Sequence, residues 1–298
     1  MKPRNVLLVA FWMAGALLSF SGMALAIRSL ARTLTLFDIL ALRNAAGLAV
    51  LLAAATIHAP FRSQFRPGRP SLHALRNTLH FGAQYAWSYG VAVLPLATAF
   101  ALEFTAPIWL GLIAVVVLGE RATTSRVGAI VLGLVGVLVI LRPGHEAFQP
   151  AALIMLAAAL GFAAVAATSK VLTTSVSTFT ILLWMNGIQL GLNAFTADWT
   201  FPRLLDASQI PAALMIAVGG LTSHLCQLQA YRHGDAIVVM PLDFLRIPLI
   251  ALVGWSFYGE ALDGWVFVGA GIIVGGILWN LWSEAERNQP RSPQAEAA

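Results

Sequence analysis

Charged residues and cysteine are both scarce in this sequence. Only 10% of the 298 residues are charged, whereas 59% are hydrophobic. A typical soluble domain has roughly 25% charged residues, so this composition argues against an ordinary water-soluble protein. The single cysteine, Cys226, excludes a disulfide within the chain, and the cysteine content therefore says nothing about the redox compartment.

Sequence motifs of enzymes and pumps are missing as well. The chain has no H-E-x-x-H motif, and its six histidines are too scattered to suggest a metal site. No glycine-rich phosphate-binding loop is present, which argues against a pump driven by ATP. An intramembrane enzyme is therefore a weak alternative, and we expect no metal, no cofactor and no catalytic residues.

Long apolar runs predict an all-α, polytopic membrane protein. A spanning helix needs about 17–25 mostly apolar residues. Residues 77–118 are too long for one crossing, and Gly90 and Pro95 mark the turn that divides them. With that division the chain has ten candidate spans: 5–27, 36–58, 77–94, 96–118, 124–141, 150–169, 178–197, 209–230, 235–257 and 264–283.

The N-terminal segment is predicted to be the first span and not a signal peptide. Lys2 and Arg4 precede an apolar run that is longer than the 7–15 residues of a usual signal-peptide core. At the other end of the chain, residues 284–298 are polar and rich in proline and alanine. We expect this tail to be disordered.

Basic residues in the loops predict the orientation, because cytoplasmic loops are enriched in Lys and Arg. With the N-terminus inside, twelve basic residues fall in cytoplasmic segments: Lys2, Arg4, Arg62, Arg66, Arg69, Arg76, Arg121, Arg126, Lys170, Arg232, Arg287 and Arg291. Only Arg28, Arg32, Arg142 and Arg203 fall outside. We expect both termini in the cytoplasm and the chain in a bacterial-type inner membrane. The net charge of +5 does not indicate binding to nucleic acid, since these residues lie in short loops.

The sequence repeats itself at an offset of about 140 residues. The stretches 37-FDILALRN-44 and 179-FTILLWMN-186 share Phe, Ile, Leu and Asn at matching places. The pairs 103-EF-104 and 243-DF-244 also match, as do the Gly-Glu pairs that end at 120 and 260. These matches indicate two five-helix units, residues 5–141 and 150–283. Because five is odd, the second unit must be inverted in the membrane, an arrangement typical of secondary transporters.

Charges inside the spans mark a candidate site. A charge at mid-bilayer costs roughly 2.5–3.5 kcal/mol on insertion scales, and such residues usually face a partner or a water-filled cavity. Glu103 and Asp243 occupy equivalent repeat positions, which suggests a site near the pseudo-twofold axis. Asp243 and Arg246 can pair at i, i+3, and this pair either neutralises itself or binds substrate. Titration of Glu103 or Asp243 would suit coupling to protons.

Polar and aromatic residues of neighbouring spans complete the predicted substrate pathway. Arg43 either lines the pathway or extends to the membrane interface. Asn44 and Asn186, which are equivalent in the repeats, either line it or hydrogen-bond between helices. The other candidates are Gln84, Trp87, Tyr89, Phe104, Trp184, Gln227 and Phe244, with an interfacial aromatic belt as the alternative for Tyr89. His224 is interpreted as a packing residue.

Prolines and glycines suggest how the spans are shaped and packed. Pro107, Pro241 and Pro248 lie near the acidic residues, where each removes a helical hydrogen bond and frees a carbonyl group. Gly271 and Gly275 form a small-xxx-small pattern. This pattern supports close helix packing either within the chain or in a homodimer.

These features resemble the drug/metabolite transporter superfamily, and specifically its EamA-type members. The fourth span of each repeat contains proline and ends in Gly-Glu, as in 107-PIWLGLIAVVVLGE-120 and 248-PLIALVGWSFYGE-260. The resemblance covers residues 6–282. It implies a central cavity between the repeats that opens to each side in turn, with the Gly-Glu pairs as structural elements and not as substrate ligands.

The resemblance also implies the class of cargo. Its members move amino acids, nucleosides, vitamins, S-adenosylmethionine and amino-acid-derived metallophores. An acid and a base in one cavity suit a zwitterion, so we predict export of a small amino-acid-like metabolite, with an opine-type metallophore as one candidate. Import of a vitamin, a nucleoside-like compound or S-adenosylmethionine is the alternative.

Overall fold

The computed structural model of the chain describes residues 6–116, 123–142, 149–233, 239 and 242–287, and these residues form helices and connecting turns without a strand. The helices are α1 (Val6–Leu30), α2 (Leu36–Ile57), α3 (Ala59–Arg62), η1 (Ser63–Phe65), α4 (Pro70–Val93), α5 (Leu96–Glu103), α6 (Ala106–Val116), α7 (Thr124–Leu141), α8 (Ala151–Leu172), α9 (Thr178–Asn193), η2 (Phe201–Leu204), η3 (Ala207–Gln209), α10 (Ile210–His233), α12 (Arg246–Tyr258) and α13 (Gly264–Arg287). The chain is therefore all-α over these ranges. The predicted tail begins as helix, since α13 continues to Arg287, and residues 288–298 lie outside the described part.

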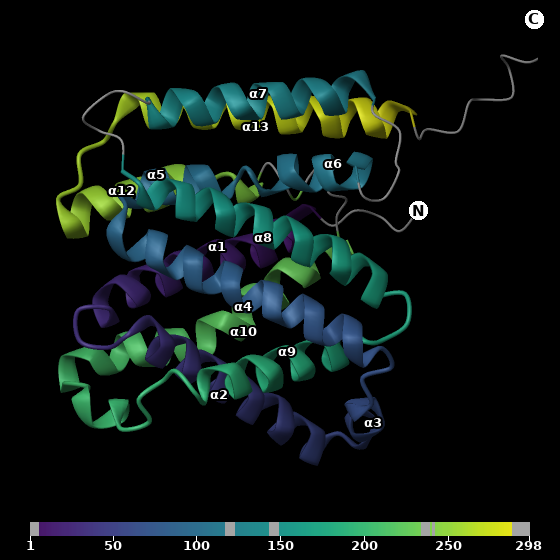
Figure 1. Cartoon of the computed structure of the whole chain (residues 1–298), viewed down its shortest axis with the longest axis vertical. Coiled ribbons are helices and arrows are strands. Elements are labelled where there is room, and N and C mark those ends of the chain that lie inside the picture. The colour runs from purple at the N-terminus through teal and green to yellow at the C-terminus, as the bar shows by residue number, and fades with distance from the viewer. Residues whose placement is uncertain (1–5, 117–122, 143–148, 234–238, 240–241, 288–298) are drawn as a thin grey trace, which may run out of the picture.

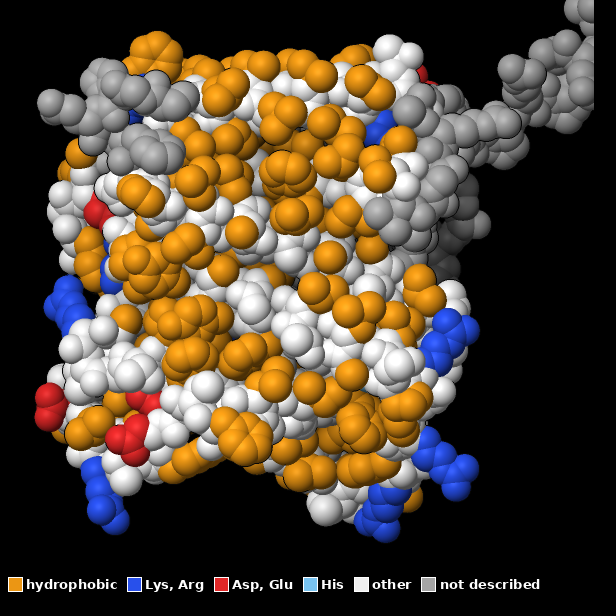
Figure 2. Space-filling view, in the orientation of Figure 1, with side chains coloured by type: hydrophobic (Ala, Val, Ile, Leu, Met, Phe, Trp, Pro, Cys, Tyr) orange, Lys and Arg blue, Asp and Glu red, His pale blue; other side chains and the backbone are white. Residues whose placement is uncertain are grey.

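Within the described part of the chain, seven helical segments are long and apolar enough to cross a membrane. They are α1, α2, α5 together with α6, α7, α8, α10 and α13. The three other predicted spans correspond to α4, α9 and α12. Helices α9 and α12 have only 16 and 13 residues, and α4 is long but carries a row of buried polar residues. Hydrophobic side chains cover the middle of the visible surface, and most visible Lys and Arg side chains lie at its two edges (Figure 2).

The long helices run side by side and pack in pairs (Figure 1). α1 packs along α10, α2 along α9, α4 along α8, and α7 along α13. The α7–α13 pair is especially close, because a Cβ on Gly136 would lie 2.7 Å from the carbonyl oxygen of Gly269. Gly271 and Gly275 are different: they are exposed, and an added Cβ would meet no described atom within 4 Å.

The fourth and ninth predicted spans are both broken, and at equivalent positions. α5 ends at Glu103, two residues form a turn, and α6 begins at Ala106. In the second half Asp243 is helical, two residues form a turn, and α12 begins at Arg246. Each break therefore directly follows one of the two acidic residues.

The prolines lie beside these breaks and not within them. Pro107 is the second residue of α6 and Pro248 is the third residue of α12. The first turn of a helix tolerates proline, since its missing N–H would have no helical partner. Pro107 and Pro248 therefore lie in the first turn of the helix that follows each break. This position corrects the expectation that the prolines interrupt a continuous helix. Pro241 lies outside the described residues.

Ion pairs identify the two ends of the bundle. Arg142, at the end of α7, pairs with Asp263, just before α13. Arg126, at the start of α7, pairs with Glu284, near the end of α13, at 2.8 Å. We call the end with the Arg142–Asp263 pair the Glu260 end, because Glu260 lies in the loop before α13. The end with the Arg126–Glu284 pair is the Glu284 end. α1 begins and α13 ends at the Glu284 end (Figure 1).

The main hydrophobic core lies in the half of the bundle nearest the Glu260 end. Its buried members include Ile27 and Leu30 at the end of α1, Leu94 and Leu96 at the α4–α5 junction, and Ile140 at the end of α7. Toward the Glu284 end the buried apolar residues form two small clusters: Val9, Met13, Ala230 and Val239, and Leu51, Ala55, Phe179 and Leu183. Packed side chains therefore close the Glu260 end.

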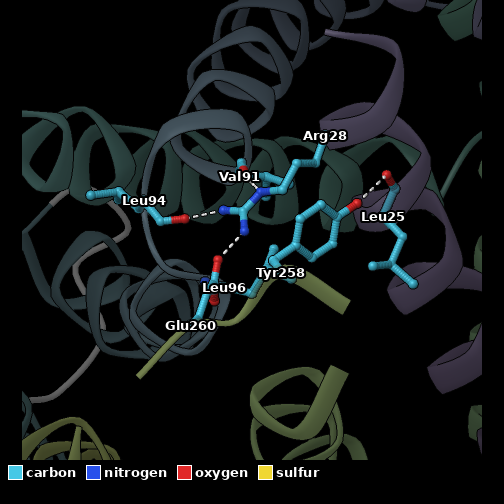
Figure 3. Close-up of polar contacts among 7 residues, drawn as sticks. All are labelled: Leu25, Arg28, Val91, Leu94, Leu96, Tyr258 and Glu260. Atoms are coloured by element: carbon cyan, nitrogen blue, oxygen red, sulfur yellow. Dashed lines mark hydrogen bonds and ion pairs between the residues drawn. The ribbon is translucent and has the colours of Figure 1, made fainter. Parts of the chain in front are cut away.

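Glu260 joins elements from both halves of the chain at this closed end (Figure 3). The guanidinium group of Arg28, on α1, donates to the Glu260 carboxylate and to the Leu94 carbonyl, and its Nε donates to the Val91 carbonyl at 3.0 Å. The second Glu260 oxygen accepts the Leu96 N–H at 2.8 Å. A carboxylate is favourable there, because Leu96 begins α5 and helix N-termini attract negative charge.

Gly259, the first residue of the Gly-Glu pair, is required by the backbone conformation at the end of α12. It ends α12 in the left-handed region, with φ of 64°, where a residue with a Cβ would be strained. The glycine thus turns the chain so that Glu260 can reach α1 and α5. This geometry gives the pair at 259–260 a structural role, whereas Glu120 lies outside the described residues.

Candidate functional site

A cavity of about 440 Å³ lies where the two broken helices meet. Both halves of the chain contribute to its wall. The lining residues are Phe20, Met23, Arg43, Arg76, His80, Gln84, Trp87, Glu103, Phe104, Ala106, Pro107, Phe162, Val165, Ala166, Ser169, His224, Gln227, Asp243, Phe244 and Arg246.

Arg246 is the centre of a charged cluster at the two breaks. Its Nη1 lies 3.3 Å from Oε1 of Glu103, and its Nη2 donates to Oδ1 of Asp243. The indole N–H of Trp87 donates to Oε2 of Glu103 at 2.8 Å. Glu103, which has no basic neighbour in its own helix, is therefore paired with a cation from the other half of the chain. The Arg246 side chain is only 3% exposed and bridges the two breaks.

Aromatic rings surround this cluster on its apolar side. The Arg246 guanidinium carbon lies 4.3 Å from the centre of the Phe20 ring and 5.2 Å from that of Phe104, distances at which cation–π attraction operates. Phe104 and Phe244, the residues that follow the two acids, meet edge-to-face with ring centres 5.0 Å apart. The breaks are thus held together by both charge and aromatic packing.

Two further arginines, Arg43 on α2 and Arg76 on α4, line the cavity without a carboxylate partner among the described residues. Arg43 is 3% exposed and lies against Gly220, so it points inward and does not extend to the membrane interface. Its Nη2 lies 3.5 Å from Nε2 of His224. Nε of Arg76 donates to the Ser169 hydroxyl at 2.7 Å.

The sequence interpretation missed Arg76 and His80 and undervalued His224. The sequence places Arg76 in a loop, because the predicted third span starts at residue 77, whereas α4 begins at Pro70. Arg76, His80, Gln84 and Trp87 follow one another at intervals of four, four and three residues, which places them on one helix face. This polar row was the available signal.

The cavity brings together nine of the thirteen predicted pathway residues, together with Pro107. The nine are Arg43, Gln84, Trp87, Glu103, Phe104, Gln227, Asp243, Phe244 and Arg246. Pro248 does not line the cavity, since it lies two residues beyond Arg246, the α12 residue that reaches it.

The other four predicted pathway residues lie elsewhere. Asn44 is buried beside Arg43, whose Nη1 lies 3.4 Å from its Oδ1. Asn186 donates to the Leu182 carbonyl of its own helix at 2.8 Å. The indole of Trp184 donates to the Phe65 carbonyl at 3.0 Å and so holds η1 against α9.

Tyr89 is the fourth of these residues and is exposed on the outer surface. It follows Trp87 by two positions, which corresponds to about 200° around a helix. Because Trp87 points into the cavity, Tyr89 points away from it. This position agrees with the alternative of an interfacial aromatic residue.

The cavity extends from the breaks toward the Glu284 end. Arg76 lies in the second turn of α4, and Ser169 in the last turn of α8. The start of α4 and the end of α8 both lie at the Glu284 end (Figure 1). In the opposite direction the main core separates the cavity from the Glu260 end.

Comparisons with known proteins agree with this architecture. The EamA-like transporter family matches the chain twice, over residues 7–142 and 149–282. A riboflavin transporter of Rhizobium johnstonii is 29% identical over 293 residues, which cover 97% of this chain and 95% of that protein. An S-adenosylmethionine uptake transporter of Rickettsia bellii is 26% identical over 227 residues, or 75% of this chain and 76% of that protein.

Two further proteins with lower sequence identity also match the chain. A pseudopaline exporter of Pseudomonas aeruginosa is 25% identical over 261 residues, covering 86% of this chain and 89% of the exporter. A solved crystal structure with 21% identity superposes with a TM-score of 0.61, covering 94% of this chain and 99% of the other, and so shares the fold. The apolar helices and these matches make the protein an integral membrane transporter and not an enzyme. The chain belongs to the EamA-like transporter family, within the drug/metabolite transporter superfamily.

Proposed function

We propose that this protein is a secondary active transporter that exports a small amino-acid-like metabolite across the bacterial inner membrane by alternating access. The observation that carries the proposal is the cavity at the two helix breaks. Glu103, Asp243 and Arg246 face it from both halves of the chain. Charges buried in a membrane protein usually serve a cargo or ion pathway.

The proposal includes two inverted five-helix repeats, residues 5–141 and 150–283, with ten spans. The helix pairs support it. Exchange of the repeats maps the α1–α10 pair onto the α8–α4 pair and maps the α2–α9 and α7–α13 pairs onto themselves. The two breaks also map onto each other. Such repeats can exchange conformations and so open a central site to each side in turn.

We further propose that the Glu284 end faces the cytoplasm, with both chain termini there. Exposed Arg62, Arg66 and Arg69 at this end support the orientation, since cytoplasmic loops are enriched in basic residues. The cavity would then be directed inward, as an exporter requires when it takes up cargo. Proton exchange through Glu103 or Asp243, and a homodimer through the exposed Gly271 and Gly275, are parts of the proposal that need separate tests.

Import of a vitamin or nucleoside-like compound is the second candidate. It is favoured by the relatives named riboflavin transporter and S-adenosylmethionine uptake transporter. Aromatic side chains in the cavity wall, such as Trp87, Phe162 and Phe244, are also suited to stack on a planar ring.

Metabolite profiling tests the function. Cells with and without the protein are compared, inside and outside, and an exporter should shift one class of compound to the medium. Flux of that compound in inside-out vesicles should be abolished by Asp243→Asn. Arg246→Ala should act likewise, although it leaves two carboxylates unpaired, so membrane insertion is measured for both variants. Normal flux in inserted Asp243→Asn, or conversion of the compound without a gradient, would contradict the proposal.

A further inference from the structure

We infer that the cavity has two poles of opposite charge and selects a cargo with one amine and two carboxylates, hence a net charge of −1. This inference rests on the proposed transport function and names the class of cargo. The amine belongs at the acidic pole formed by Glu103 and Asp243. The carboxylates belong at the cationic pole formed by Arg43 and Arg76.

The acidic pole carries one negative charge in excess. Arg246 contributes one positive charge and contacts two carboxylates, those of Glu103 and Asp243. One carboxylate charge is therefore left without a matching cation within the cluster. A protonated amine of the cargo supplies that cation, and the Phe104 and Phe244 rings beside it accept the carbon groups that such an amine carries.

Arg43 is a buried cation without a carboxylate partner among the described residues. It is 3% exposed, and its Nε has no hydrogen-bond partner in the described structure. Its two guanidinium contacts, to Asn44 and His224, are long, at 3.4 and 3.5 Å. A buried ion without a partner costs several kcal/mol, and a carboxylate in the cavity would offset this cost.

Two neighbouring donors point to the same chemistry. Gln84, which also lines the cavity and is 5% exposed, has an amide nitrogen that meets no hydrogen-bond partner within the described ranges. Arg76 uses Nε and Nη1 for Ser169 and Asn77, and its Nη2 forms no hydrogen bond to the described residues. These groups supply donors without acceptors, which is the pattern that an anionic ligand requires.

The charges of the whole cavity set the charge of the cargo. Three arginines and two carboxylates line it, which gives a net charge of +1 when the histidines are neutral. A cargo of charge −1 balances this excess. The poles are also separated: Arg76 and Trp87, which donates to Glu103, are eleven residues apart on α4, or roughly 16 Å along the helix axis. The favoured cargo is therefore elongated, with its amine and one of its carboxylates at opposite ends.

Calorimetric binding to the purified full-length protein tests this inference. The probe is L-phenylalanyl-L-glutamate, with its amine at one end and its two carboxylates at the other, and its comparator is L-phenylalanyl-L-glutamine, which has lost one carboxylate. The diacid should bind at least about tenfold more tightly, equal to about 1.4 kcal/mol. Arg43→Gln and Arg76→Gln should reduce this preference to less than about threefold, whereas the exposed control Arg203→Gln should leave it unchanged.

Thermal unfolding distinguishes a binding role from a structural one. Removal of a buried cation that has no carboxylate partner among the described residues should leave the Tm of cargo-free Arg43→Gln unchanged or raised, and Arg43→Lys should restore part of the preference. Absent diacid binding, equal affinity for the two probes, an unchanged preference in both glutamine variants, or full binding energy from inorganic phosphate alone would overturn the inference. Diacid binding without flux in proteoliposomes would instead count against the proposed transport function, and the inferred preference for one amine and two carboxylates would remain supported.

Discussion

The Arg28–Glu260 pair predicts a measurable change in how the molecule opens. Its side chains are 10% and 17% exposed, and Glu260 also accepts the Leu96 N–H. Hydrogen bonds to charged groups contribute about 1.5–3 kcal/mol. Glu260→Gln keeps an acceptor for Leu96 but removes the charge opposite Arg28. We expect the closed Glu260 end to lose about 1.5–3 kcal/mol, which increases the fraction of molecules open at this end about 10- to 150-fold.

Cysteine accessibility measures that fraction. Cys226→Ser removes the native thiol, and Ala99→Cys introduces a new one. Ala99 is completely buried and lies one turn from Glu103 toward the Glu260 end, so a reagent from that side reaches it only after opening. Labelling by a membrane-impermeant reagent should accelerate about 10- to 150-fold when Glu260→Gln is added.

A second ion pair at the same end provides the control. Arg142 and Asp263 are more exposed, at 26% and 35%, and exposed pairs contribute about 0–1 kcal/mol. Asp263→Asn should therefore change the labelling rate less than about fivefold. An unchanged rate in Glu260→Gln, or an equal acceleration in Asp263→Asn, would refute the view that the Glu260 contacts hold this end closed.

Three other substitutions probe packing and hydrogen bonding. Gly136→Ala should lower the Tm, because overpacking costs about 1–3 kcal/mol. Gly271→Ala should leave the Tm unchanged, since its new Cβ would meet no described atom within 4 Å. Equal Tm values for the two variants would contradict the close α7–α13 contact. Gly259→Ala should destabilise the protein by about 1–2 kcal/mol in thermal unfolding, because its backbone is left-handed. Trp87→Phe removes the hydrogen bond to Glu103, and cargo affinity should fall about tenfold or more in calorimetry; unchanged affinity would argue against a positioned carboxylate.

Part of the site could be predicted from the sequence, because a charged residue inside an apolar span usually faces a charged partner or a water-filled cavity. Glu103, Asp243 and Arg246 were identified in this way, and the repeat offset brought the first two to equivalent positions. The sequence also drew attention to both broken helices through Pro107 and Pro248. It misplaced the breaks, since proline fits the first turn of a new helix as well as a kink.

The remainder depended on information that residue type does not carry. Whether Asn186 or Trp184 faces the cavity is decided by the rotation of α9, and its neighbours set that rotation. Arg76 shows a different difficulty: an arginine near a span boundary is compatible with a loop or with an inner helix face. The row of polar residues on α4 would have separated the two interpretations.

The two helix breaks have a mechanical consequence. α5 packs against both α12 and α8, and α6 packs against α8. In the first half of the chain a joint of two residues links α5 to α6. Separation of α12 from α5 can therefore open one end of the molecule while α5 and α6 both remain packed on α8. Cargo that binds at the joints would then affect which end of the molecule can open, and its affinity would in turn depend on which end is open.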